Sequence, residues 1–295
     1  MSVSDNMKGA ALMSGSMAGY TLNDACMKAL AGDLPLSQAV FLRGVLTCVM
    51  LYALGLALRS LTFKLNRREW KLMLWRSVAE AGATYCFLSA LFNMPIANVT
   101  AVLQALPLTI ALAAWVFLKE PLGWRRLVAI LVGFVGVIMI VQPGGDGFTA
   151  WSIYALVAVG FITFRDLVVR KMAPETPSMT VALVTAIVIT VSFGVASFGV
   201  EWAPVNAWNG LVLFLSAVFI FIGYLFAVMV MRVGDIGFVA PFRYTGLIWA
   251  LIIGLVLFNE WPGALTLAGA SIVVATGLFT LLRERQLARR LKFED

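Results

Sequence analysis

The sequence predicts an all-α polytopic membrane protein with ten transmembrane helices, and three observations support that prediction. First, 61% of the 295 residues are hydrophobic and only 13% are charged, whereas soluble domains carry about 45–50% apolar and about 25% charged residues. Second, the apolar residues gather in runs of roughly 20, the length of a helix that crosses about 30 Å of hydrocarbon. Third, basic residues occupy alternate loops, as expected when they stay on the cytoplasmic side.

The limits of each helix follow from the polar residues, prolines and glycines that interrupt the apolar runs. At the tight Asn93-Met94-Pro95 break the alternative is a kink within one long hairpin. The ten predicted helices lie near residues 8–30, 37–59, 70–93, 95–118, 123–142, 150–172, 178–200, 207–232, 235–259 and 263–283.

Loop charge predicts the orientation. With the N-terminus inside, the outer loops hold only the acidic residues Asp33, Asp146, Glu201 and Glu260, and Lys28 near an outer helix end is the one departure. The positive-inside rule therefore predicts a multi-pass protein of the plasma (inner) membrane with both termini cytoplasmic. The basic residues of the inner loops and tails are Lys8, Arg59, Lys64, Arg67, Arg68, Lys71, Lys119, Arg125, Arg126, Arg170, Lys171, Arg232, Arg283, Arg285, Arg289, Arg290 and Lys292.

Several functional classes are disfavoured by composition. The net charge of +7 is better explained by contact of short loops with anionic lipid head groups than by nucleic acid, so we expect no nucleic-acid partner. Cys26, Cys48 and Cys86 lie within apolar runs without metal-ligand or disulfide spacing, and the chain has no histidine. No phosphate-binding glycine loop occurs. We therefore expect no metal and no cofactor.

An internal repeat recurs with an offset of about 140 residues. The segment 19–28, with Gly-Tyr followed by Asp24 and Lys28, resembles 160–170, with Gly-Phe followed by Asp166 and Arg170. A proline-containing helix ends in Glu120-Pro121 in one half and in Glu260-Trp261-Pro262 in the other, and a glycine-rich helix follows each. The alternative is that glycine-rich membrane helices resemble one another generally.

The repeat predicts how the halves are arranged. Five is odd, so a second five-helix repeat must enter the membrane with the opposite orientation, as is typical of secondary transporters with a site between the halves. We expect the first repeat over residues 1–144, the second over 145–283, and a basic cytoplasmic tail over 284–295.

Eight ionisable residues lie inside the apolar runs. Each costs roughly 2.5–3.5 kcal/mol at the bilayer centre, so we expect all of them to be partnered, hydrated or close to an interface. Spacing of four residues predicts the pairs Asp24–Lys28, Arg76–Glu80 and Asp166–Arg170. Proton coupling and internal ion pairing both remain open for Asp24, Lys28, Arg43, Arg76, Arg165 and Asp166.

Arg243 differs because no acid lies three or four residues from it. Either an acid on another helix pairs with it, or it faces a cavity, where it suits a carboxylate and an aromatic ring. Glu80 is its counterpart, able to meet an amino group or exchange a proton. Pro107 and Pro241 are the predicted hinges. The candidate substrate-binding residues are Tyr20, Asn23, Glu80, Tyr85, Asn98, Thr100, Gln104, Tyr224, Arg243, Tyr244 and Trp249; for Asn98 and Gln104, hydrogen bonding between helices is the alternative.

The five-plus-five plan, with a glutamate–proline turn and a glycine-rich final helix in each half, resembles EamA-type members of the drug/metabolite transporter superfamily, most of all the YddG-type exporters of aromatic amino acids. The resemblance implies a central cavity lined by helices 1–4 and 6–9, with helices 5 and 10 mainly structural. Lys119 stands where the family usually has a small residue before the first glutamate.

Three functional hypotheses follow. The leading one is a secondary transporter that exports small amphipathic metabolites, aromatic amino acids among them, by alternating access. The alternatives are a channel or scramblase and a membrane-embedded lipid-processing enzyme. We expect no enzymatic activity, because neither a metal-ligand set nor a G-x-S-x-G motif occurs. The expected partners are a small-molecule substrate and the bilayer, with a monomer favoured and a homodimer as the alternative.

Overall fold

The structure, a computed structural model, describes residues 3–120, 122–144, 149–173, 175–233 and 236–294, and these residues form helices and loops without a strand. The helices are α1 (Val3–Ala29), α2 (Leu36–Ala57), α3 (Arg67–Asn93), α4 (Ile96–Leu103), α5 (Leu106–Leu118), α6 (Trp124–Val141), α7 (Ala150–Val169), α8 (Ser178–Ser197), α9 (Ala207–Val233), α10 (Ile236–Val239), the 3-10 helix η1 (Ala240–Tyr244), α11 (Thr245–Phe258) and α12 (Ala264–Glu294).

The prediction of ten membrane-spanning helices is confirmed. The helices α4 and α5 together form the fourth span, and α10, η1 and α11 form the ninth. Within the described residues, eight spans are long and apolar enough by themselves to cross a membrane. The other two are α1 and α3, whose charged residues include Asp24, Lys28, Arg76 and Glu80. The break at Met94-Pro95 is a turn between two helices, not a kink within one.

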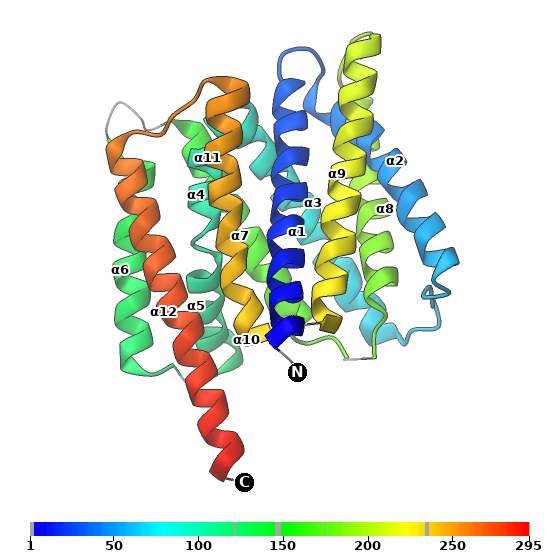
Figure 1. Cartoon of the computed structure of the whole chain (residues 1–295). Helices are drawn as coiled ribbons and strands as arrows, with labels where there is room; N and C mark the ends of the chain where they lie inside the picture. Colours follow the sequence, from blue (N-terminus) through cyan, green and yellow to red (C-terminus); the bar gives the residue numbers. More distant parts are fainter. Residues whose placement is uncertain (1–2, 121, 145–148, 174, 234–235, 295) are drawn as a thin grey trace.

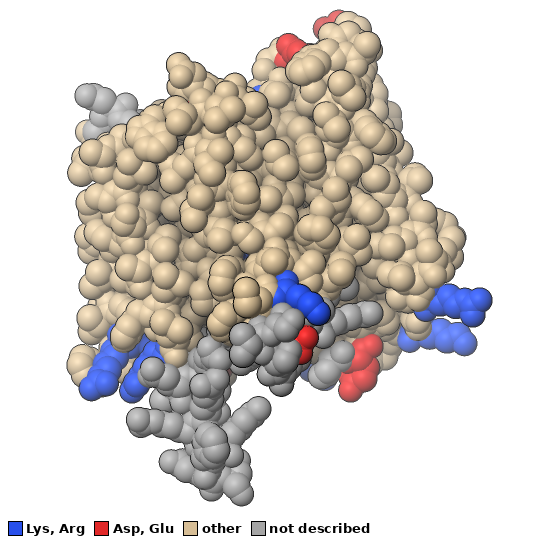
Figure 2. Space-filling model, viewed as in Figure 1, with Lys and Arg blue, Asp and Glu red and all other residues tan. Residues whose placement is uncertain are grey.

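Both chain ends lie at the same end of the bundle (Figure 1), here called the inner end. Basic side chains gather along this rim, whereas the middle of the face seen in Figure 2 is almost entirely uncharged. Large apolar side chains are exposed along the lengths of the spans; Leu131 of α6 and Val191 of α8, for example, are each 57% exposed. Such a belt is unfavourable in water and is stabilised by lipid.

Two predicted hinge prolines lie where spans are interrupted. Pro107 is in the first turn of α5, and the chain breaks just before it at Gln104–Ala105. Pro241 lies in η1, between α10 and α11. Proline lacks an N–H and clashes with the preceding turn, which explains both interruptions. Movement about these breaks stays a prediction.

The helices pair as an inverted repeat requires. α1 packs on α9, α3 on α7, α2 on α8, and α6 on α12. A shift of five spans along the chain converts the α1–α9 pair into the α3–α7 pair, and the reverse. The same shift maps the α2–α8 pair and the α6–α12 pair onto themselves. Glycines permit the closest approaches: a Cβ on Gly269 would lie 2.5 Å from the Gly136 carbonyl oxygen, so α6 and α12 touch backbone to backbone.

Equivalent polar contacts recur at opposite ends of the bundle. At the outer end, the Gln38 side chain donates to the Ala203 carbonyl and accepts from its N–H, at 2.8 and 2.9 Å. At the inner end, the Thr180 hydroxyl donates to the Thr62 carbonyl and accepts from its N–H, at 3.1 and 3.0 Å. These two contacts tie the first half to the second on both faces.

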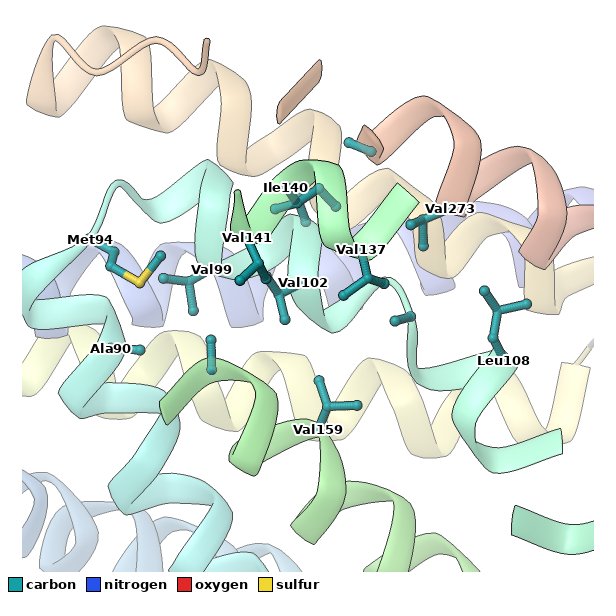
Figure 3. Packing of buried hydrophobic residues seen from close by; sticks show 14 of the residues in the cluster. Ala90, Met94, Val99, Val102, Leu108, Val137, Ile140, Val141, Val159 and Val273 are labelled. Atoms are coloured by element: carbon teal, nitrogen blue, oxygen red, sulfur yellow. The ribbon is translucent and has the colours of Figure 1, made fainter. Parts of the chain in front are cut away.

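An apolar core holds the supporting helices together. Figure 3 shows part of this cluster, which joins residues of α3, α4, α5, α6, α7 and α12 around side chains that are almost fully buried. Val99, Val102 and Ile130 expose none of their surface. The cluster gives the α6–α12 pair a rigid connection to the helices that carry the polar residues. The labelled members are Ala90, Met94, Val99, Val102, Leu108, Val137, Ile140, Val141, Val159 and Val273.

Candidate functional site

Three charged side chains meet between the halves at the middle of α3. Arg165 of α7 donates from Nη1 to Glu80 Oε2 of α3 at 2.7 Å, and from Nε to Asp166 Oδ1 at 2.8 Å. The side chains of Glu80, Arg165 and Asp166, here called the central triad, are 16%, 19% and 24% exposed. One cation therefore serves two carboxylates in a mostly buried place, where paired charges interact strongly.

A second polar cluster lies about two turns below the outer end of α2. Asn23 Oδ1 accepts from Arg43 Nη1 at 3.0 Å and from the Ser216 hydroxyl at 2.8 Å, and Asn23 Nδ2 donates to Asp24 Oδ1 at 2.9 Å. This outer cluster, Asn23, Asp24, Arg43 and Ser216, joins α1 and α2 of the first half to α9 of the second. Asn23 and Arg43 are 4% and 6% exposed.

A third contact joins α3 to α8. The Arg76 guanidinium donates from Nη1 to the Thr185 hydroxyl, which also lies 3.2 Å from the Ser77 hydroxyl. Arg76 Nε is buried, and no described group accepts a hydrogen bond from it. Thr185 follows Arg43 by 142 residues (185 − 43), so the same place in each half carries a buried polar side chain.

Two tyrosines also connect the halves. The ring of Tyr20 meets the ring of Tyr224 edge to face, with centroids 5.6 Å apart. The tyrosine pair therefore joins α1 of the first half to α9 of the second.

The three ion pairs predicted from helical spacing are wrong. Arg165, and not Arg76, pairs with Glu80. Lys28 pairs with Glu260 at 2.9 Å in place of Asp24, and Arg170 pairs with Glu120 at 2.8 Å in place of Asp166. A pair at spacing four stabilises a helix by only about 0.2–0.5 kcal/mol. Neighbouring helices offer closer partners, and that adjacency is not visible in local spacing.

Arg243 lies in η1, at the break of the ninth span, and its side chain is exposed. Among the described residues no acidic side chain pairs with it, which leaves the cavity interpretation of this residue open. Because a guanidinium facing lipid is costly, we infer that Arg243 faces water.

The structure contains an aromatic cavity of about 440 Å³ at the outer end of the α3–α7 contact. Tyr85 and Tyr154 line it side by side with ring centroids 6.2 Å apart, and the ring centroid of Trp151 lies 5.4 Å from that of Tyr154. Of the predicted binding residues, this cavity includes Tyr85. The same two helices carry the central triad at greater depth. The other lining residues are Pro35, Leu36, Ser37, Ser89, Phe92, Asn93, Phe193, Ala196 and Val200.

The remaining predicted residues lie in the fourth and ninth spans. The Tyr244 hydroxyl points at Gly277 of α12, so it faces a supporting helix. Asn98 Oδ1, Tyr244 Oη and Trp249 Nε1 are buried without a hydrogen-bond partner among the described residues. Thr100 and Gln104 are half-buried near the end of α4.

Several residues of these clusters were not predicted from the sequence. Ser216 and Thr185 are common small polar residues in apolar helices, and only the repeat offset distinguishes them. Trp151 fits a membrane-interface residue equally well. Three or more His, Cys, Asp or Glu side chains do not cluster as a metal site within the described residues.

The comparisons with known proteins agree with this architecture. Residues 7–142 match the EamA-like transporter family. One solved crystal structure superimposes with a TM-score of 0.64 over 99% of both chains at 18% identity, which shows the same fold. Within the matched residues, Lys119 is left-handed with φ 58°, a backbone conformation that glycine adopts more readily than lysine.

Named relatives cover much of the chain. The pseudopaline exporter of Pseudomonas aeruginosa is 26% identical over 263 residues, covering 86% of this chain and 89% of that protein. The S-adenosylmethionine uptake transporter of Rickettsia conorii is 28% identical over 197 residues, 66% of each chain. The riboflavin transporter of Brucella anthropi is 25% identical over 236 residues, 76% of this chain and 82% of that one. All three are small-molecule transporters, and none is named for aromatic amino acids.

Proposed function

We propose that the chain is a secondary carrier for zwitterionic amphipathic metabolites, with aromatic amino acids as the first candidates, and that it works by alternating access between residues 1–144 and 145–283. One observation carries the proposal: among the described residues, the central triad, the outer cluster and the Arg76–Thr185 contact, which join helices of the two halves, contain three acids and three arginines. They are Glu80, Asp24 and Asp166 against Arg43, Arg76 and Arg165.

A balanced charge cluster suits a substrate that brings both signs. An α-amino acid offers a carboxylate to an arginine and an ammonium group to an acid, so it replaces internal partners without leaving a buried charge unpaired. Arg243 is exposed and lacks an acidic partner among the described residues, which makes it the first candidate for the carboxylate. Glu80 is the corresponding candidate for the ammonium group.

The aromatic cavity suits the rest of such a molecule. Tyr85, Tyr154 and Trp151 offer ring faces and edges with hydroxyl groups nearby, and aromatic pairs contribute about 0.5–1.5 kcal/mol beyond burial. The relatives support this class. S-adenosylmethionine contains an α-amino acid and an aromatic base, and riboflavin has an aromatic ring system.

Direction and driving force form a separate part of the proposal. The relatives include an uptake transporter and an exporter, so related chains carry solutes either way. We propose export, following the resemblance to amino acid exporters. Facilitated diffusion and proton coupling through Asp24, Glu80 or Asp166 are both compatible with the cluster. The inner membrane, with both termini cytoplasmic, is the proposed location because the basic loops share the end that carries both termini.

Counterflow in proteoliposomes tests the proposal. Vesicles with purified protein are loaded with unlabelled phenylalanine, tryptophan or S-adenosylmethionine and diluted into a trace of the labelled compound. We expect transient, saturable accumulation that needs the protein and is lost in Glu80→Gln. The exposed-loop variant Lys64→Gln serves as the matched control and keeps the parent rate. Flux that never saturates favours a channel, conversion of added lipid favours an enzyme, and no flux with folded protein removes this substrate class.

A further inference from the structure

Two matching ion pairs join the halves at opposite faces of the bundle. At the outer end Lys28 Nζ lies 2.9 Å from Glu260 Oε1, and at the inner end Arg170 Nη1 lies 2.8 Å from Glu120 Oε2. The basic residues are 142 positions apart (170 − 28) and the glutamates 140 (260 − 120). Each pair connects the end of the first helix of one half to the turn before the last helix of the other.

The backbone presents both glutamates in the same way. Lys119 and Asn259, which precede them, have left-handed φ values of 58° and 52°. The N–H of Glu120 then donates to the Ala114 carbonyl at 3.3 Å, and that of Glu260 to the Gly254 carbonyl at 2.8 Å. A left-handed residue ends a helix and folds the chain back on it. Both carboxylates are thus held by one repeated turn.

The outer pair also forms hydrogen bonds with a third element, the turn between α3 and α4. Glu260 Oε2 accepts from the N–H of Ile96 at 3.1 Å, and Lys28 Nζ donates to the Met94 carbonyl. Lys28 also lies 5.4 Å from the centre of the Phe258 ring. The side chains of Lys28 and Glu260 are only 10% and 25% exposed. The outer pair therefore fastens the α3–α4 turn of the first half to the α11–α12 turn of the second.

The inner pair is more open. Arg170 Nη1 donates to both carboxylate oxygens of Glu120 at 2.8 Å, but the two side chains are 37% and 46% exposed. The turn that corresponds to 94–95 falls at 234–235, outside the described residues. Exposed pairs contribute little to stability, whereas a partly buried pair with further hydrogen bonds contributes more.

Resting on the proposed carrier function, we propose that Lys28 and Glu260 form its outer gate and that Arg170 and Glu120 form its inner gate. Each pair bridges the halves, so rocking that opens one face must separate the pair on that face and keep the other. The structure has both pairs formed, with the outer one better sealed. Weakening the outer pair then favours outward opening, and weakening the inner pair favours inward opening.

Distances between spin labels test this proposal in the full chain reconstituted into nanodiscs, with Cys26, Cys48 and Cys86 replaced by alanine. Labels at Asn93 and Gly263 report the outer face, and labels at Gly123 and Lys171 report the inner face. Asn93 and Lys171 are exposed, and a Cβ on either glycine meets nothing within 4 Å. Pulsed electron resonance gives the population at each distance.

We expect Lys28→Gln to raise the ratio of long to short outer distances about fivefold and to leave the inner distances short. Arg170→Gln does the reverse and is the matched control. The swapped inner pair Arg170→Glu/Glu120→Arg, whose side chains bond each other, restores the parent inner distances, which separates gating from misfolding. Unchanged outer distances in Lys28→Gln, or equal lengthening at both faces, overturn the proposal. Counterflow on the same variants keeps the two questions apart, because transport with unchanged distances contradicts the gates and not the carrier.

Discussion

Gly269→Ala tests the backbone contact between α6 and α12. The added Cβ lies 2.5 Å from the carbonyl oxygen of Gly136, whereas carbon and oxygen need about 3.3 Å, so α12 must move away by roughly 0.8 Å. The obstacle is backbone and has no rotamer through which to yield. Overpacking of this kind costs about 1–3 kcal/mol. The helix propensity gained by replacing glycine with alanine offsets at most about 1 kcal/mol of that cost.

Thermal unfolding of the detergent-purified protein measures this cost. For chains of this size or somewhat smaller, each kcal/mol lost from the free energy of unfolding lowers Tm by about 2–4 °C. We therefore expect Gly269→Ala to lower Tm by about 3–6 °C. Gly160→Ala is the matched control, since Gly160 is also helical but its Cβ would meet nothing within 4 Å. That variant keeps or slightly raises Tm. Equal Tm values for the two variants refute the proposed backbone contact between α6 and α12.

Three further predictions concern the charged and aromatic groups. Arg165→Gln leaves Glu80 and Asp166 without their cation, so we expect a loss of about 3–5 kcal/mol, seen as a clear fall in Tm together with loss of counterflow. Arg243→Ala keeps the parent Tm, because the residue is exposed and unpaired among the described residues, but raises the half-saturating substrate concentration; unaltered saturation contradicts its role. Tyr85→Ala weakens competition by phenylalanine about 2- to 10-fold and leaves competition by alanine unchanged, and an equal loss for both amino acids argues against ring recognition.

Much of the fold was predictable because its causes are local. Hydrophobic length defines a span without knowledge of its neighbours, and basic residues orient a loop through the membrane itself. The repeat was also visible, because Lys28 and Arg170, and Glu120 and Glu260, keep nearly one offset. Even the turn at Met94-Pro95 followed from a proline that cannot continue the preceding helix.

The partners within the site were much less predictable. Spacing of four residues assigned Lys28 to Asp24, yet Lys28 binds Glu260, 232 positions away (260 − 28). No local feature of the sequence distinguished Ser216 and Thr185. In the structure, Thr185 accepts a hydrogen bond from Arg76, and Ser216 donates one to Asn23. Tyr244 was expected at a cavity, and its hydroxyl instead points at a glycine of α12.

Sequence alone thus determined the number of spans and the residues too polar to face lipid, because both depend on the free energy of a side chain in water or hydrocarbon. The tertiary structure alone decided which of those residues meet. Helices far apart in the chain become neighbours when their small residues pack, as at Gly136 and Gly269, and electrostatic attraction over a few ångströms then selects the partner. The two bridging ion pairs at opposite faces are the result of that packing.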